Sequence, residues 1–188
     1  MKYTQVYRVI RKLVDLLSDL NEKTPTFLVG FCGEVLVKSK LIENGISFIS
    51  KGGQAGFDIL LQANRKKVEV RSSLLKNEGI YPKGIMFYGW RIKDRDKVEK
   101  YDYLICVALD NRLTNPRFYI FTREEAMKAG DVNIPRYKKV QKKLHLFRNL
   151  KEMEKAIQKR PDYVTEWEIY VNRNRSKYEN RWEILKHE

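Results

Sequence analysis

With 43% hydrophobic and 33% charged side chains, the 188-residue chain has the composition of one folded domain, which excludes a disordered protein. Its net charge of +14 favours a polyanionic partner such as nucleic acid, the alternative being the lysine-rich solvated surface of a heat-adapted protein. No apolar run reaches the length of a membrane span and the start, MKYTQVYRVIRK, lacks a signal-peptide pattern, so we expect a cytoplasmic protein with no membrane partner.

Two helices are predicted at the start of the chain. Residues 2–20 place apolar side chains at the three- and four-residue spacing of an amphipathic helix. A second helix runs from Pro25 to Asn44, between a proline in its first turn and a glycine that stops it. On this helix Glu34 lies among apolar side chains and needs a partner, which Lys38, one turn later, supplies in the simplest interpretation.

A β-hairpin is predicted next. A short strand at Ile46–Ser50 and a glycine-rich loop at Lys51–Gly56 lead into two runs of alternating apolar residues, Phe57–Ala63 and Lys66–Ser72. The turn between them is expected at Asn64–Arg65. With the turn centred there, one face of the hairpin is apolar, with Ile59 opposite Val70 and Leu61 opposite Val68.

The opposite face of this hairpin carries the candidate site. There Asp58 lies opposite Arg71 and Glu69 opposite Leu60, with the two carboxylates diagonally roughly 7–8 Å apart. Carboxylates this close repel each other unless a positive charge lies between them, and a divalent metal ion meets that need. A turn longer or shorter by one residue would place Asp58 and Glu69 on opposite faces.

The next elements predict a mixed α/β domain. Tyr101–Asp110 is a nearly continuous apolar run, typical of a strand buried on both faces, and Phe118–Phe121 is a further strand. Thr122–Glu125 has the pattern of a capping box and starts a helix that ends at Gly130. We therefore expect one α/β domain over residues 1–188, with its core at about residues 24–130.

A basic and aromatic extension is predicted from about residue 131 to residue 188, and we expect it to be helical. Its first part holds five cations and no acid: Arg136, Lys138, Lys139, Lys142 and Lys143. We assign this run to phosphate contacts, the alternative being a solvated charged surface. After a short charged helix at Leu150–Arg160, residues from Trp167 to Leu185 keep the spacing of an amphipathic helix that packs on the domain or on the second subunit of a homodimer.

The hairpin resembles the PD-(D/E)XK nuclease superfamily. Asp58, a ten-residue gap and Glu69–Ser73 (EVRSS) are similar to its motif of an aspartate on one strand and Glu-x-Lys on the next, often followed by serines. Glu34 matches the glutamate that a preceding helix often supplies. The resemblance covers roughly residues 24–121 and implies a restriction-endonuclease-like mixed sheet flanked by helices. It departs from the family pattern at Arg71, where the motif has lysine.

The resemblance implies a divalent-metal-dependent endonuclease that hydrolyses DNA phosphodiester bonds, of restriction, repair or junction-resolving type. We assign Asp58 and Glu69 as ligands of Mg²⁺, for which Mn²⁺ can substitute, with the carbonyl of Val70 as a third ligand. Glu34 serves a second ion or positions water. Arg71 is expected to hold the scissile phosphate and stabilise transition-state charge, but it cannot act as a base because its guanidinium stays protonated.

Arginine at the lysine position leaves three outcomes open. The metal alone activates water, a displaced lysine such as Lys76 or Lys83 reaches the site, or catalysis is weak or absent. In the last case the chain is a non-catalytic nucleic-acid-binding module of the same fold. An RNA-acting nuclease is a further alternative, because charge does not distinguish RNA from DNA. Besides the basic run, the residues assigned to nucleic acid are Ser72, Ser73, Lys76 and Lys83.

Overall fold

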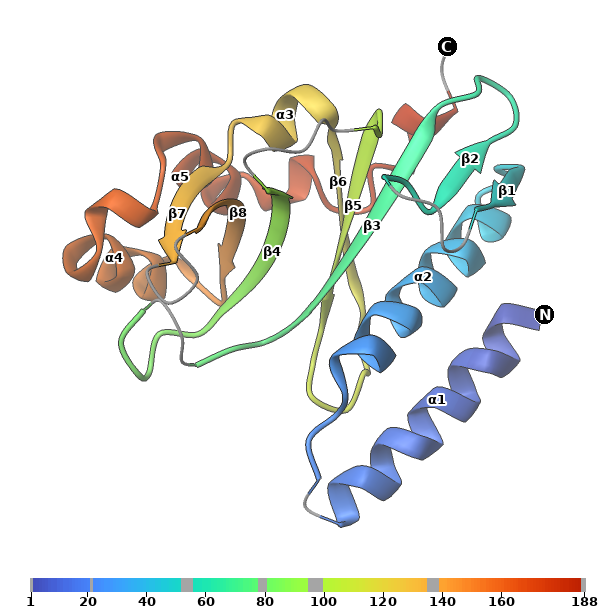
Figure 1. Cartoon of the computed structure of the whole chain (residues 1–188), viewed down its shortest axis with the longest axis horizontal. Coiled ribbons are helices and arrows are strands. Elements are labelled where there is room, and N and C mark those ends of the chain that lie inside the picture. The colour runs from blue at the N-terminus through green and yellow to red at the C-terminus, as the bar shows by residue number, and fades with distance from the viewer. Residues whose placement is uncertain are drawn as a thin grey trace.

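The computed structural model describes residues 2–20, 22–51, 56–77, 81–94, 100–134 and 139–186. Over these residues the protein is a mixed α/β structure, as predicted, with a five-stranded sheet of order β1-β2-β3-β5-β6 and a three-stranded sheet of order β4-β8-β7. Two N-terminal helices lie on one side of the larger sheet, and the smaller sheet with the C-terminal helices lies on its other side (Figure 1).

The N-terminal helices form where the spacing predicts them, as α1 (Lys2–Asp19) and α2 (Thr26–Glu43). Helix α2 packs directly against the larger sheet, and α1 packs on α2 through Ile10 and Val14. The apolar side chains of both helices and of the sheet face beneath them form one core, so the helix layer and the sheet stabilise each other.

The larger sheet holds β1 (Phe48–Ser50), β2 (Ile59–Leu61), β3 (Lys67–Leu74), β5 (Tyr103–Leu109) and β6 (Arg117–Thr122). Strands β3 and β5 are parallel, and the other neighbours are antiparallel. Strand β5 is buried on both faces, as predicted, with Ile105 and Val107 in the core under α2 and Leu104 and Cys106 in the core between the sheets. The predicted capping box starts α3 (Arg123–Met127).

The smaller sheet holds β4 (Phe87–Asp94), β7 (Gly130–Ile134) and β8 (Lys139–Phe147). The predicted helical extension is therefore wrong at its start, and it becomes helical only at α4 (Leu150–Lys159). Residues on both sides of β8 are buried, with Leu144 and Leu146 facing the larger sheet and Phe147 packing near α4. A strand covered on both faces lacks the polar–apolar alternation that identifies a strand in a sequence.

The terminal amphipathic helix is also shorter than predicted. It ends as α5 (Glu166–Arg173), and two short 3₁₀ helices follow, Arg175–Lys177 and Trp182–Leu185. Asn174 caps the end of α5, and its side-chain amide donates to the Tyr170 carbonyl (2.9 Å). Further along, Asn180 has a left-handed backbone (φ 57°) between the two 3₁₀ helices. Trp182 still packs in the core under α2, so the segment lies on its own domain.

Buried polar side chains attach α5 to β8. Strand β7 pairs with β8 only as far as Gly130 and Lys143. Beyond this pair, the Glu168 carboxylate accepts a hydrogen bond from the His145 N–H (2.8 Å). Further along, the Asn172 amide donates to the His145 carbonyl and accepts from the Phe147 N–H, each at 2.9 Å. These side chains replace a neighbouring strand, because buried backbone groups need partners. His145 therefore has a structural role in this part of the fold.

Candidate active site

The hairpin that carries the candidate site is paired differently from the prediction. Ile59 lies opposite Val68, and the predicted partner Val70 is two residues further along β3. The pairing ends at Ile59, and the Asp58 N–H donates to the Val68 carbonyl (3.0 Å), so the predicted pair of Asp58 with Arg71 is wrong. A shift of two residues keeps the paired side chains of β2 and β3 on the faces predicted for them.

A longer turn causes the shift. The Leu61 N–H donates to the Lys66 carbonyl (2.9 Å), so residues 62–65 form the turn in place of the predicted pair at 64 and 65. Asn64 Oδ1 accepts from the Lys66 N–H (3.1 Å), and Arg65 adopts a left-handed backbone with φ 58°. The short side chain of asparagine favours such turns by bonding the backbone two residues ahead.

The Asp58 carboxylate is fixed on β3. Its Oδ2 accepts from the Val70 N–H at 2.8 Å, while its own N–H donates to the Val68 carbonyl at 3.0 Å. Burial raises the pKa of the Asp58 carboxyl and Glu34 raises it further, whereas the Val70 N–H, Arg71 and Lys38 act in the opposite direction. Asp58 is thus a desolvated acid with an acid and two cations close to it.

Glu69 is the second acid of the site. It is only 5% exposed, and its Oε1 pairs with Nη2 of Arg71 at 2.5 Å. The Arg71 side chain is 40% exposed, so the guanidinium reaches from the buried carboxylate to the surface. It retains N–H donors for a further acceptor, because a guanidinium carries five.

Helix α2 contributes Glu34 and Lys38, which form an ion pair at 3.1 Å. The helix lies very close to β3: a Cβ on Gly33 would meet Ser72 Oγ at 1.7 Å. Only glycine allows this approach, which brings the neighbouring Glu34 to Asp58. Lys38 is a residue that the sequence indicated only as a surface partner of Glu34. It is 7% exposed and close enough to Asp58 to lower that residue's pKa.

The donor set fits Mg²⁺ in part. Among the described residues, no three His, Cys, Asp or Glu side chains are placed to ligate one ion, and Glu34 is held by Lys38. Mg²⁺ needs fewer protein ligands, because it binds through one or two carboxylates plus water and substrate phosphate. The Val70 N–H points to Asp58, so the Val70 carbonyl points to the same side of β3. Asp58, Glu69 and this carbonyl are thus suitable donors.

The two serines of the motif lie inside the structure. Ser72 Oγ is buried against α2 and has no hydrogen-bond partner among the described residues. Ser73 is buried between the sheets, where its Oγ accepts from the Gly89 N–H (3.2 Å) and donates to the Leu74 carbonyl (3.0 Å). Packing and the junction of the two sheets therefore account for both serines in this structure.

A second charged group, which we call the basic group, consists of Lys76, Arg91 and Lys143. Arg91 on β4 lies opposite Lys143 on β8, and Lys76 pairs with Phe87 at the start of β4. Burial lowers the pKa of the Lys143 amine, and the charges of Lys76 and Arg91 lower it further. Like charges on paired strands repel, so this group favours an anion. Arg91 does not stand out in the sequence, because its neighbour Lys143 lies on another strand and the glycine-broken segment around Arg91 has no clear strand signal.

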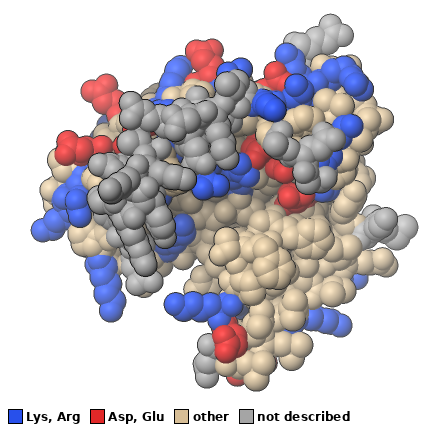
Figure 2. Space-filling view, in the orientation of Figure 1, with Lys and Arg blue, Asp and Glu red and all other residues tan. Residues whose placement is uncertain are grey.

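The remaining predicted cations have different surroundings. Lys142 donates to the Ala129 carbonyl (2.7 Å) and pairs with Asp131 (3.1 Å), so it connects β8 to its neighbour. Lys83 is exposed in the turn before β4. Arg136 and Lys138 lie outside the described residues, and only the backbone of Lys139 is described. In Figure 2, the visible surface over α1 and α2 is broadly uncharged, while most lysines and arginines lie elsewhere.

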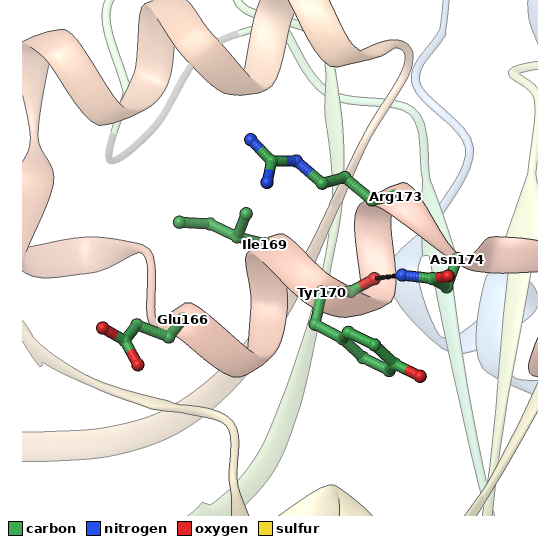
Figure 3. Close-up of a pocket in the computed structure, with 5 residues that line it drawn as sticks. All are labelled: Glu166, Ile169, Tyr170, Arg173 and Asn174. Atoms are coloured by element: carbon green, nitrogen blue, oxygen red, sulfur yellow. Dashed lines mark hydrogen bonds between the residues drawn. The ribbon is translucent and has the colours of Figure 1, made fainter.

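Surface hollows lie apart from these residues. Figure 3 shows one on α5, with a volume of about 490 Å³ and lined by Glu166, Ile169, Tyr170, Arg173 and Asn174. The side chains of Glu166 and Tyr170 point away from each other, and Arg173 extends along the opposite side of the helix from Tyr170. A second hollow, between α1 and β1, is lined by Tyr3, Phe48 and their neighbours. Neither is lined by a candidate site residue.

Comparisons with known proteins give a likeness in structure only. No protein-family model matches the sequence, and no curated protein matches it. Among solved structures, the chain is similar to a bacterial homing endonuclease, I-Ssp6803I, with a TM-score of 0.46 and 18% sequence identity over 81% of this chain and 96% of that chain.

Proposed function

We propose that this protein is a divalent-metal-dependent endonuclease that hydrolyses DNA phosphodiester bonds at Asp58 and Glu69. The observation that carries the proposal is that two poorly solvated carboxylates belong to one hairpin, with Asp58 held by the N–H of Val70, the residue after Glu69. Burying acids opposes folding, and such acids with cations beside them are typical of functional sites. Their order along the chain is the one that resembles the PD-(D/E)XK superfamily.

Asp58, Glu69 and the Val70 carbonyl would hold Mg²⁺ or Mn²⁺. Held there, the ion would supply charge neutralisation for a phosphate oxygen and would lower the pKa of the water molecule needed for hydrolysis. The protein fixes the position of the donors, because the Val70 N–H orients one carboxylate and Arg71 the other. Arg71 has the exposure to contact the scissile phosphate and stabilise its charge through the donors that Glu69 leaves free.

Lys38 is the lysine that the fold brings to this site. Lys76 and Lys83, expected as substitutes for the motif lysine, lie on the side of the smaller sheet. Lys38 instead reaches Glu34 at 3.1 Å and acts on Asp58, so we assign it to orient the attacking water together with Glu34. This role compensates for Arg71, which cannot accept a proton.

The basic group extends the DNA contact. From Arg71, the backbone of β3 continues to Lys76, and five extended residues span at most about 17 Å. That length corresponds to about five base pairs of a duplex at 3.4 Å each. A phosphate bound at Arg71 and others bound by the basic group would therefore lie on one duplex.

A non-catalytic DNA-binding module is the second candidate, favoured by Arg71 in the lysine position and by its ion pair with Glu69. The experiment that separates the two is incubation of supercoiled plasmid with the wild-type protein and with Arg71→Lys, in Mg²⁺, Mn²⁺ or chelator. We expect nicked or linear DNA with either metal and none with chelator.

Retained binding without cleavage by both proteins would overturn the enzyme and leave the binding module. The same incubation with RNA tests the third candidate, because cleavage of RNA alone would exclude a DNA endonuclease. The Arg71→Lys variant keeps the charge but loses the planar fork, so we expect weaker cleavage if the site depends on two-point phosphate binding.

A further inference from the structure

Helix α1 carries two apolar stripes, and only one of them is used by the fold. The first stripe packs on α2 and includes Val6, Ile10, Val14 and Leu17. The second stripe consists of Val9, Leu13, Leu16 and Leu20, each between 45% and 73% exposed. One apolar face is enough for a helix to pack on a domain, so the fold does not account for the second stripe.

The spacing of the second stripe is that of a helix pair. Its members are separated by four, three and four residues, the repeat that keeps apolar side chains on one seam between two helices. Figure 1 shows α1 at the edge of the molecule, with α2 on its inner side. The stripe therefore faces outward along the length of α1.

Charge along α1 indicates what covers the stripe. The residues that flank it on its polar side are Arg8 and Lys12 in the first half of the helix and Asp15 and Asp19 in the second half. With two-fold symmetry, an identical helix running in the same direction would place the two charged flanks on opposite sides of the seam, where cations and acids of the two helices do not meet. A partner with this same sequence running in the opposite direction would set cations against acids.

We propose that α1 pairs antiparallel with α1 of a second copy of this chain through Val9, Leu13, Leu16 and Leu20. In this pairing Val9 meets Leu20 and Leu13 meets Leu16 of the second copy. Two-fold symmetry keeps the charged flanks on the same side, so that each Lys12 lies between Asp15 and Asp19 of the other helix. Arg8 lies beside Asp19 of the other helix, and each contact occurs twice.

The interface leaves the candidate active site uncovered. Helix α2 separates α1 from the larger sheet, and the Asp58 and Glu69 carboxylates belong to that sheet. The dimer stands independently of the proposed endonuclease, because none of its residues is assigned to catalysis. Loss of cleavage would not argue against the dimer, and loss of the dimer would not argue against cleavage.

The first test is the mass of the full chain in solution by light scattering and sedimentation, over a protein concentration range up to about 100 µM, which detects a dimer with a Kd of about 10 µM. We expect a concentration-dependent dimer for the wild type and a monomer for Leu13→Glu/Leu16→Glu. Both positions are exposed, and the circular dichroism spectrum checks that the fold is kept. The control is Leu150→Glu, an equally exposed position at the start of α4, which should leave the dimer intact.

The second test concerns the antiparallel direction. Lys12→Glu and Asp15→Lys alone should each weaken the dimer about three- to tenfold, because each change places like charges together twice. The double variant Lys12→Glu/Asp15→Lys should restore it. A monomeric wild type at all concentrations would overturn the proposal and leave the stripe to another occupant. A dimer insensitive to the charge changes, or a larger oligomer, would overturn the antiparallel pairing.

Discussion

Asp58 shows how the site opposes folding. Burial raises the pKa of its carboxyl in the folded chain, so the folded state binds a proton more tightly than the unfolded state. Stability is therefore lost as the pH rises from the unfolded pKa, about 3.9, through the raised folded value. At neutral pH the ionised carboxylate destabilises the fold, and a cation bound beside it would offset that effect.

We predict that Asp58→Asn raises the melting temperature at neutral pH. Asparagine keeps an oxygen for the Val70 N–H and removes the poorly solvated charge. Below about pH 4 the aspartate is protonated and the difference should disappear. Thermal unfolding from pH 3 to pH 8 measures this, with Glu43→Gln, on an exposed residue paired with Lys40, as the control. A lower melting temperature for Asp58→Asn at neutral pH would mean that its ionic contacts outweigh its desolvation.

At this scale the roles given to Asp58, Glu69 and Arg71 stay predictions. Glu69 and Arg71 form an ion pair on β3, where alternation places them on one face. Lys38 was predicted only as a helix-surface partner of Glu34. Its burial depends on the closeness of α2 to β3, which is a tertiary contact without a local signal. Arg91 was missed for the same reason, since its neighbour Lys143 lies on another strand.

At the scale of elements, the contact between α2 and β3 determines whether the site forms. Gly33 faces Ser72, and the next residue on the helix is Glu34. The close approach also buries Lys38. Any side chain at residue 33 would separate helix and strand, and would move Glu34 and Lys38 away from Asp58.

We predict that Gly33→Ala destabilises the protein by about 1–3 kcal/mol, because the added Cβ overlaps Ser72 Oγ. Gly30→Ala, on the same helix with nothing within 4 Å of its added Cβ, should raise stability by about 0.5–1 kcal/mol through helix propensity. Denaturant unfolding compares the two variants. Gly33→Ala/Ser72→Ala should recover only part of the loss, because the Ser72 Cβ also lies within 2.9 Å. Equal stability of the two single variants would show that α2 does not pack this closely.

The type of an element was predictable where one of its faces is exposed to solvent or where a capping motif marks the end of a helix. Helices α1, α2, α3 and α4 followed from spacing and end signals, and β5 from its continuous apolar run. The hairpin turn was mispredicted because the Asn64 side chain and the left-handed Arg65 lengthen it. Strands β7 and β8 were wrongly predicted as helix. Both faces of β8 are covered by other parts of the fold, so its lysines and apolar residues do not alternate as they do in a strand with one exposed face.

At the scale of the whole molecule, positive charge lies in two places with different surroundings. Arg71 and Lys38 lie among the acids of the larger sheet, and the basic group lies on the smaller sheet. The +14 charge predicted a polyanionic partner but not this division, because Lys76, Arg91 and Lys143 come together only when β3 is followed by β4 and β8. Among the described residues no helix is long and apolar enough to cross a membrane.

The central claim is that Asp58 and Glu69 hold the metal ion with which DNA is cut. The direct test is the single-turnover rate of cleavage of a labelled duplex as a function of Mg²⁺ concentration, for wild type, Asp58→Asn, Glu69→Gln and the control Glu43→Gln. We predict a saturable Mg²⁺ dependence for wild type and control, and a rate at least about 100-fold lower for both site variants with DNA binding retained. Cleavage by Asp58→Asn or Glu69→Gln at the wild-type rate and with the wild-type Mg²⁺ dependence would contradict the claim.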